Sequence, residues 1–170
     1  MRARRARISD SQEIYRLIAH YAREGLLLPR TEDEIRGHIG HFLILQEKGR
    51  LRSCIALEGY GADLAEIRSL AVDPEMHGRG SGAKLIEFAL QEARRRGITR
   101  VFAVTHAPEF FMRYGFETAR RQSLKEKIER DCRTCAKRRS CRLVAVTRTV
   151  IPEQVTLPIL DDAGVPVSLS

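Results

Sequence analysis

A glycine-rich loop between a strand pattern and a helix pattern constrains the fold more than any other feature of the chain. Residues 64–72 are predicted to form a β-strand, which Pro74 closes, and the sequence His-Gly-Arg-Gly-Ser-Gly follows at residues 77–82. Residues 83–96 then carry apolar side chains at the spacing of an amphipathic helix. A strand that runs through a glycine loop directly into a helix indicates α/β layering.

Helix and strand patterns alternate along the rest of the chain as well. A single domain over residues 1–150 accounts for all of them, and the stretch 151–170, which has no periodicity, is expected to form an extended or partly disordered arm. The other predicted elements are a strand at 4–8, a helix that Gly25 ends, a short helix after Thr31, hairpin strands at 42–46 and 52–57, a buried strand at 101–104, a short helix at 108–113 and a late strand at 143–150.

Two of the helix starts carry the pattern of a capping box. In a capping box, a polar side chain and a later Glu or Gln satisfy the free amides at the beginning of a helix. The pairs are Ser9 with Gln12 or Asp10 with Glu13 at the first helix, and Thr31 with Glu34 at the second.

Length and charge exclude several classes of protein. The chain has 170 residues, with 30 Lys+Arg against 22 Asp+Glu and a net charge of +8, which suits one soluble domain. No apolar run approaches the roughly 18 residues of a membrane span, and the basic amino terminus runs into Ser9-Asp10-Ser11 instead of an apolar segment. We therefore expect no membrane association, no secretory signal and a cytoplasmic location.

The basic excess does not by itself indicate nucleic-acid binding. The Arg residues are interspersed with acidic residues, and no aromatic ladder, zinc-finger spacing or recognition-helix signature accompanies them. Arg-rich clefts hold small phosphates and carboxylates equally well, through bidentate hydrogen bonds. We expect a small anionic ligand and no nucleic acid; steeply salt-dependent binding to duplex DNA would indicate the nucleic-acid alternative.

Three of the four cysteines lie close together in the sequence. Cys132, Cys135 and Cys141 supply at most three zinc ligands, whereas a structural zinc site needs four, so Cys54 or a remote histidine would have to complete it. We expect no metal, and interpret residues 131–141 as a basic loop beside the substrate cleft. The cysteine spacing also lacks the spread of a disulfide framework, which agrees with a reducing compartment.

The chemistry of the glycine loop points to an anion. Glycines at alternate positions let the backbone come close to a ligand, and the first amides of the following helix point outward, where the helix dipole favours negative charge. A diphosphate would fit there. The pattern alone also suits a tight turn or a mononucleotide site, although the Walker lysine and an opening dinucleotide-binding unit are both missing.

The wider context resembles the GNAT acetyltransferase superfamily over about residues 2–150. The resemblance rests on the strand at 64–72, the loop at 77–82, the helix, the strand at 101–104 and the sequence Pro-Glu-Phe-Phe-Met-Arg-Tyr-Gly-Phe at 108–116. It implies a mixed central sheet flanked by helices, in which the strands at 64–72 and 101–104 splay apart to admit the pantetheine arm of acetyl-CoA. The implied cofactor-binding residues are Leu70, Ala71, Val72, His77, Gly78, Arg79, Gly80, Ser81, Gly82 and Ala83. The family usually has Arg or Gln at the position of His77.

Two further stretches resemble the short bacterial N-acetylglutamate synthases of arginine biosynthesis. One is Leu-Leu-Leu-Pro-Arg-Thr at 26–31, and the other is Glu-Ile-Arg at 66–68 together with Ala-Pro-Glu-Phe-Phe at 107–111. The resemblance implies transfer of an acetyl group to the amine of glutamate. A different amine, on a protein N-terminus, a polyamine or an antibiotic, is one alternative; a non-catalytic acyl-CoA sensor is another. A homodimer, with the strand at 143–150 exchanged between subunits, also fits the superfamily.

The resemblance also suggests roles for individual residues. Glu66 would accept the proton of the attacking amine through water, and the backbone amide of Leu70 would meet the acetyl oxygen. Glutamate carries two carboxylates, so Arg30, Arg68 and Thr105 are the candidate substrate-binding residues. The competing interpretation of Glu66 is a surface carboxylate paired with an arginine. Many relatives have a tyrosine at the position of Phe111, so no general acid is assigned; Tyr114 is expected to be a packing residue.

Overall fold

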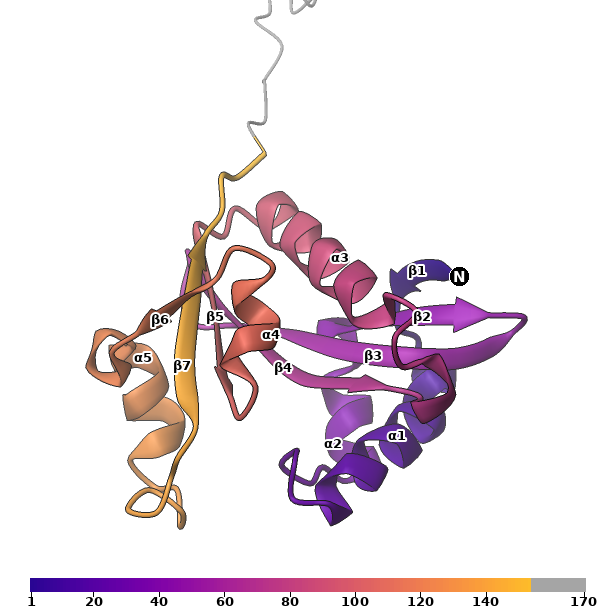
Figure 1. Cartoon of the computed structure of the whole chain (residues 1–170), viewed down its shortest axis with the longest axis horizontal. Helices are drawn as coiled ribbons and strands as arrows, with labels where there is room; N and C mark the ends of the chain where they lie inside the picture. Colours follow the sequence, from indigo (N-terminus) through magenta and orange to yellow (C-terminus); the bar gives the residue numbers. More distant parts are fainter. Residues whose placement is uncertain (154–170) are drawn as a thin grey trace, which may run out of the picture.

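One mixed β-sheet organises the chain. The computed structural model describes residues 1–153, and among these, seven strands form a sheet in the order β1-β2-β3-β4-β5-β7-β6 (Figure 1). The strands are β1 (Arg2–Arg5), β2 (Phe42–Glu47), β3 (Arg50–Gly59), β4 (Leu64–Val72), β5 (Arg100–Thr105), β6 (Glu117–Ala119) and β7 (Val144–Thr149). The helices are α1 (Ser11–Arg23), α2 (Glu32–Gly37), α3 (Ser81–Arg95), α4 (Pro108–Met112) and α5 (Lys125–Lys127), and a π-helical turn at Ile128–Cys132 continues α5.

Most predicted elements are confirmed within a few residues, and the start of the first helix is the main correction. Thr31 and Glu34 form the predicted capping box of α2. At α1, by contrast, neither predicted box forms, because the Asp10 carboxylate accepts two hydrogen bonds from Arg4 and one from the Arg7 amide. That ion pair also ends β1 early, and a short 3-10 turn at Ile8–Asp10 replaces the end of the predicted strand at 4–8.

Helices cover both faces of the sheet, which explains the continuous apolar run of β2. Leu43 and Leu45 pack with α3, whereas Phe42 and Ile44 pack with α1 and α2. All four are at most 1% exposed. A fully buried side chain of this size contributes roughly 1.5–3 kcal/mol to stability, so both layers are needed to hold the sheet. Figure 1 shows α3 on one side of the sheet and α1 with α2 on the other.

A smaller cluster packs the segment that includes α5 onto the same sheet. Phe102 and Leu124 are fully buried there, and the Tyr60 ring meets the Phe102 ring edge to face at 5.5 Å. The cluster fixes α5 beside the ends of β3 and β4. The sequence patterns indicated neither α5 nor β6.

The sheet opens between β4 and β5, as the resemblance implied. The two strands are parallel and pair only between residues 64–66 and 100–102, although β4 continues to Val72. On its other side, β4 contains a bulge: between Arg68 and Ala71 it has one residue more than β3 has between Ala56 and Cys54. Ser69, in the bulge, has a positive φ of 52°.

Three further expectations concern the late strand, the arm at 151–170 and membrane-spanning helices. The late strand, β7, pairs with β5 and β6 within the chain, and its expected exchange between two subunits stays a prediction. The expected arm at 151–170 lies outside the described residues from residue 154 onward. Over residues 1–153, none of the helices combines the length and the apolar character that crossing a bilayer requires.

Candidate active site

A buried carboxylate, Glu66, lies on β4 at the point where the sheet opens. Its side chain is only 4% exposed. The Tyr60 hydroxyl lies 2.8 Å from Glu66 Oε2, and Lys127 Nζ donates to the same oxygen at 2.9 Å. Among the described residues these contacts all fall on Oε2, which leaves Oε1 without a protein partner. Glu66 is therefore not the surface carboxylate of the competing interpretation, and one of its oxygens is available to water or a ligand.

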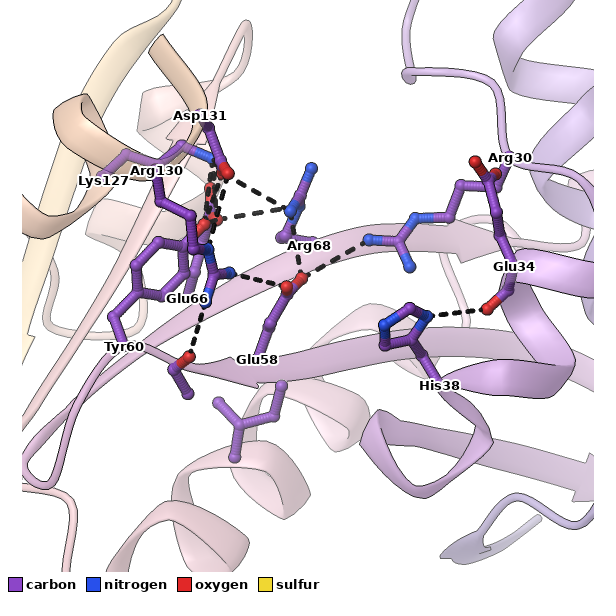
Figure 2. Close-up of polar contacts among 12 residues, drawn as sticks. Arg30, Glu34, His38, Glu58, Tyr60, Glu66, Arg68, Lys127, Arg130 and Asp131 are labelled. Carbon is purple, nitrogen blue, oxygen red and sulfur yellow. Dashed lines mark hydrogen bonds and ion pairs between the residues drawn. The ribbon is translucent and has the colours of Figure 1, made fainter. Parts of the chain in front are cut away.

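A second carboxylate completes this group (Figure 2). Asp131 Oδ2 lies 2.5 Å from both the Tyr60 hydroxyl and Lys127 Nζ. Burial works against the ionised form, but the hydrogen bonds from Lys127 and Tyr60 lower the pKa of Asp131 to about 2. Burial, together with the charge of Glu66, raises the pKa of Tyr60, so its hydroxyl stays protonated and its single proton can be donated to one of these two carboxylates at a time.

The two predicted substrate arginines converge on a third carboxylate, Glu58. Arg68 donates to Glu58 at 3.0 Å, and Arg30 lies 3.6 Å from it. Arg130 adds a contact of 2.6 Å, and its guanidinium stacks over the Tyr60 ring at 3.5 Å from the centroid. Although burial favours the protonated acid, these three arginines hold the pKa of Glu58 below its ordinary value.

The pKa values of the two predicted substrate arginines shift in opposite directions, although burial lowers both. Burial, followed by the like charge of Arg68, lowers the pKa of Arg30. Burial also works against the charge of Arg68, but Glu66 and Glu58 raise its pKa overall. Arg68 also lies 3.6 Å from Glu66, which confirms that these two side chains share a face of β4.

We name these charged residues the acceptor cluster. Its four cations outnumber its three carboxylates, so it carries a net charge of +1 before any ligand binds. An anionic group with several hydrogen-bond acceptors suits such a site. The members are Arg30, Glu58, Glu66, Arg68, Lys127, Arg130 and Asp131.

The glycine loop presents free amides at the start of α3. Gly78 and Gly80 both have a φ of +74°, a left-handed conformation that costs other residues about 1–2 kcal/mol. Gly80 is the N-cap of α3 and has no side chain with which to cap it. Because the first helical bond begins at Lys84, the amides of residues 81–83 have no partner within the helix. Three donors at a helix N-terminus form a ready site for a phosphate.

The β4 bulge turns the backbone near Leu70 away from regular pairing. Within the described residues, Ser69 and Leu70 have no partner in the register with β3, and β5 no longer pairs at this level. The extra residue also switches the alternation of the strand: Ile67 and Leu70 both pack toward α3, whereas Ala71 packs toward α1. Leu70 lies in this irregular stretch of β4, and the predicted contact of its amide with the acetyl oxygen stays a prediction.

Other predicted ligands take different positions. The His77 imidazole lies 2.8 Å from the Tyr21 hydroxyl, so it contacts α1. The Val72 carbonyl accepts a hydrogen bond from the same hydroxyl. Thr105 Oγ1 accepts from the Ala107 amide at 3.0 Å, and within residues 1–153 it has no contact with the acceptor cluster. Thr105 lies on the same face of β5 as Val101 and Ala103, which pack toward α3. Glu66 lies on the opposite face of the sheet.

The remaining candidates are structural. Phe111 is 5% exposed in the α3 core, where Tyr114 packs against it, as expected. All four cysteines are free thiols, and burial raises the pKa of Cys54 to about 12. Within residues 1–153, no three His, Cys, Asp or Glu side chains are grouped to hold a metal ion.

Sequence reasoning missed much of the acceptor cluster because its contacts span long distances along the chain. Tyr60 meets a residue 71 positions away, and Lys127 meets one 61 positions away. The spacing of Lys127 and Asp131, one helical turn apart, was the available local signal. The basic loop placed beside the substrate cleft begins with Asp131, so that interpretation located the region but not the contacts.

Comparisons with known proteins agree with this geometry. Residues 7–116 match the model of the acetyltransferase (GNAT) family. The chain is 37% identical over 147 residues to an uncharacterised N-acetyltransferase of Chlorobaculum tepidum, a match that spans 86% of this chain and 95% of the relative. It is also 37% identical over 133 residues to an amino-acid acetyltransferase of Neisseria meningitidis, covering 77% of this chain but only 30% of that larger protein.

A solved structure has a similar fold. The N-acetylglutamate synthase of Neisseria gonorrhoeae, in complex with coenzyme A and N-acetylglutamate, superimposes with a TM-score of 0.81 at 32% sequence identity. The match covers 88% of this chain and 35% of that one. With the family model matched from residue 7 to residue 116, and with a splayed β4–β5 pair beside a loop of free amides, this chain belongs to the GNAT family of acetyltransferases.

Proposed function

We propose that this chain transfers the acetyl group of acetyl-CoA to the α-amino group of an amino acid, with glutamate as the preferred acceptor. One observation carries the choice of acceptor: Arg30 and Arg68 converge on the Glu58 carboxylate beside the buried Glu66. The names of the amino-acid acetyltransferase and the N-acetylglutamate synthase among the similar proteins support the same choice.

Acetyl-CoA would bind across the opening of the sheet. Amides 81–83 would hold its pyrophosphate, and the gap between β4 and β5 would admit the pantetheine arm toward the bulge. The Leu70 amide would stabilise the oxyanion that develops when the amine attacks; the loss of one such donor costs about 3 kcal/mol in other enzymes. Leu70 would supply this donor through its backbone alone.

Glu66 would receive the proton that the amine loses. The α-amino groups of model peptides have a pKa of about 8, so much of the amine is protonated at neutral pH. A proton acceptor within reach of the amine, directly or through one water, therefore speeds its attack. Tyr60 and Lys127 hold the Oε2 atom of Glu66. Its Oε1 atom is then the proton-accepting oxygen. Arg30 and Arg68 would bind the carboxylates of glutamate, and Glu58 keeps the two guanidinium groups together when no substrate is bound.

Steady-state release of CoA with glutamate, glutamine, aspartate and lysine tests the proposal. We expect glutamate to give the highest kcat/KM, and Arg30→Ala or Arg68→Ala to raise its KM at least tenfold with a smaller change in the KM for acetyl-CoA. Arg36→Ala, which alters an exposed arginine of α2, is the matched control and should change neither KM. Turnover of peptides or polyamines without glutamate turnover would favour the broader acetyltransferase, and tight CoA binding without turnover of any amine would favour a sensor.

A further inference from the structure

The hydroxyl of Tyr21 joins three parts of the cofactor site. It donates a hydrogen bond to the carbonyl of Val72, the last residue of β4, and lies 2.8 Å from Nε2 of His77, directly before the glycine loop. Tyr21 itself belongs to α1, where its carbonyl accepts hydrogen bonds from the amides of Leu26 and Leu27. Helix α1, the end of β4 and the glycine loop therefore meet at one atom.

The direction of both hydrogen bonds follows from the Val72 carbonyl, which can only accept. The single proton of Tyr21 is used in that bond, so Nε2 of His77 must carry a proton and donate to the Tyr21 oxygen. Burial raises the pKa of Tyr21, which keeps its proton in place. Gln carries an N–H donor on its side chain as well, whereas Leu has none. The arrangement thus makes a specific demand on residue 77: it needs a side-chain N–H donor.

The first part of the glycine loop, residues 77–80, has few other contacts that could hold its position. A Cβ atom added at Gly78 or Gly80 would meet no other atom within 4 Å, whereas at the end of the loop Ser81 is buried and a Cβ at Gly82 would lie 3.0 Å from Cζ of Phe110. Before the loop, Met76 is buried and Asp73 caps the 3-10 turn at Pro74–Met76 by accepting from the Glu75 amide. Between Met76 and α3, the described side-chain contacts are that of Arg79 with Met76 Sδ at 4.0 Å and that of His77 with Tyr21, and the second of these joins the loop to α1.

We propose that Tyr21 and His77 form a latch that positions the glycine loop for the pyrophosphate of acetyl-CoA, so that both act as positioning residues for cofactor binding. The inference rests on the proposed pyrophosphate site at the amides of residues 81–83. Amides bind a phosphate strongly only when they are fixed in advance, because ordering a free loop on binding reduces affinity. The latch keeps the backbone beside these amides in one place.

Isothermal titration of CoA into the purified full-length chain tests the latch without depending on the acceptor. Tyr21→Phe removes both hydrogen bonds and keeps the ring, so we expect CoA to bind about three- to tenfold more weakly, since a hydrogen bond contributes about 0.5–1.5 kcal/mol. His77→Leu should weaken binding equally, and the double variant should bind no more weakly than either single variant. His77→Gln should restore binding, and Tyr15→Phe, on the same helix, should leave it unchanged.

The outcomes separate the latch from the cofactor site. Undiminished CoA binding by Tyr21→Phe, additive losses in the double variant, or no rescue by His77→Gln would each overturn the latch. If the unaltered chain itself gave no heat with CoA, the proposed cofactor site would fail, and the latch with it. His77 is exposed, so His77→Leu remains a test of the latch even if Tyr21→Phe does not fold.

Discussion

Replacing Asp131 with Asn should make the stability difference from the unaltered chain depend on pH. The pKa of Asp131 is about 2 in the folded chain, against an ordinary value of 3.8. A folded pKa below the unfolded one adds stability above about pH 4 and loses it as the pH falls through 2. The difference of about 1.8 between the two pKa values corresponds to about 2.4 kcal/mol at pH 7. Because the side chain is 27% exposed, we reduce this to about 1–2 kcal/mol.

Urea unfolding followed by circular dichroism measures this contribution. At pH 7, Asp131→Asn should lower the unfolding midpoint by about 0.5–1 M, and at pH 3 the difference should fall to about half. The charged neighbours Lys127, Arg68 and Arg130 are unchanged in the variant, and Asn can still accept hydrogen bonds from Lys127 and Tyr60. Other carboxylates with lowered pKa values, such as Asp10 and Glu92, titrate in both proteins, so their effects cancel in the comparison.

Glu129→Gln provides the control, because it removes a charge from the same turn at an exposed position. Its effect should stay within about 0.5 kcal/mol at both pH values. A deficit of Asp131→Asn that is the same size at pH 3 as at pH 7 would show that the loss comes from packing or geometry. The ionised state of Asp131 would then not be what stabilises the cluster.

Two further predictions concern Glu66, the proposed proton acceptor, and the start of α3. Glu66→Gln should lower kcat by about a hundredfold or more in steady-state CoA release while CoA binding is retained, because Gln fills the same space but cannot take the proton; an unchanged kcat would remove Glu66 from the mechanism. Gly82→Ala should raise the KM for acetyl-CoA several-fold, because the new Cβ would lie 3.0 Å from Cζ of Phe110 and displace the amides of the helix start. Gly37→Ala, whose Cβ would meet nothing within 4 Å, is its control; equal KM values for the two variants would contradict the role given to that helix start.

The elements with strong local patterns were predicted well, because many consecutive side chains in each of them favour the same secondary structure. β4 has the predicted bounds of residues 64–72, and α3 begins two residues before its prediction, at Ser81. β6 could not be predicted in this way. It is three residues long, its residues are polar or small, and its extended form depends on pairing with β7.

The site was only partly predictable, because some of its features depend on local sequence and others on contacts between distant parts of the chain. Free amides at a helix start are a local property of the backbone, so the sequence could predict a phosphate site at residues 78–83; of these, the amides of 81–83 have no partner within the helix, whereas the Arg79 amide donates to the Met76 carbonyl. Of the partners of Glu66, Tyr60 follows β3 and Lys127 comes from α5, and the position of α5 depends on the packing of Phe102 and Leu124. The predicted cap of α1 was wrong although its pattern is local, because the Asp10 carboxylate forms an ion pair with Arg4 and does not cap the helix. Nothing in the residue type of Ser69 indicated a left-handed conformation in the strand.

If the acceptor cluster binds the amine as proposed, the short pairing between β4 and β5 links substrate choice to the stability of the protein. Backbone pairing joins the two halves of the sheet over only three residues of each strand, and the acceptor cluster adds ion pairs between the half that contains Glu66 and the half that carries Lys127 and Asp131. Replacing these charged residues to admit another amine would also remove ion pairs that connect the two halves of the sheet. Substrate specificity and stability therefore cannot be changed independently, and a redesign of the acceptor cluster needs a compensating change elsewhere between β4 and β5.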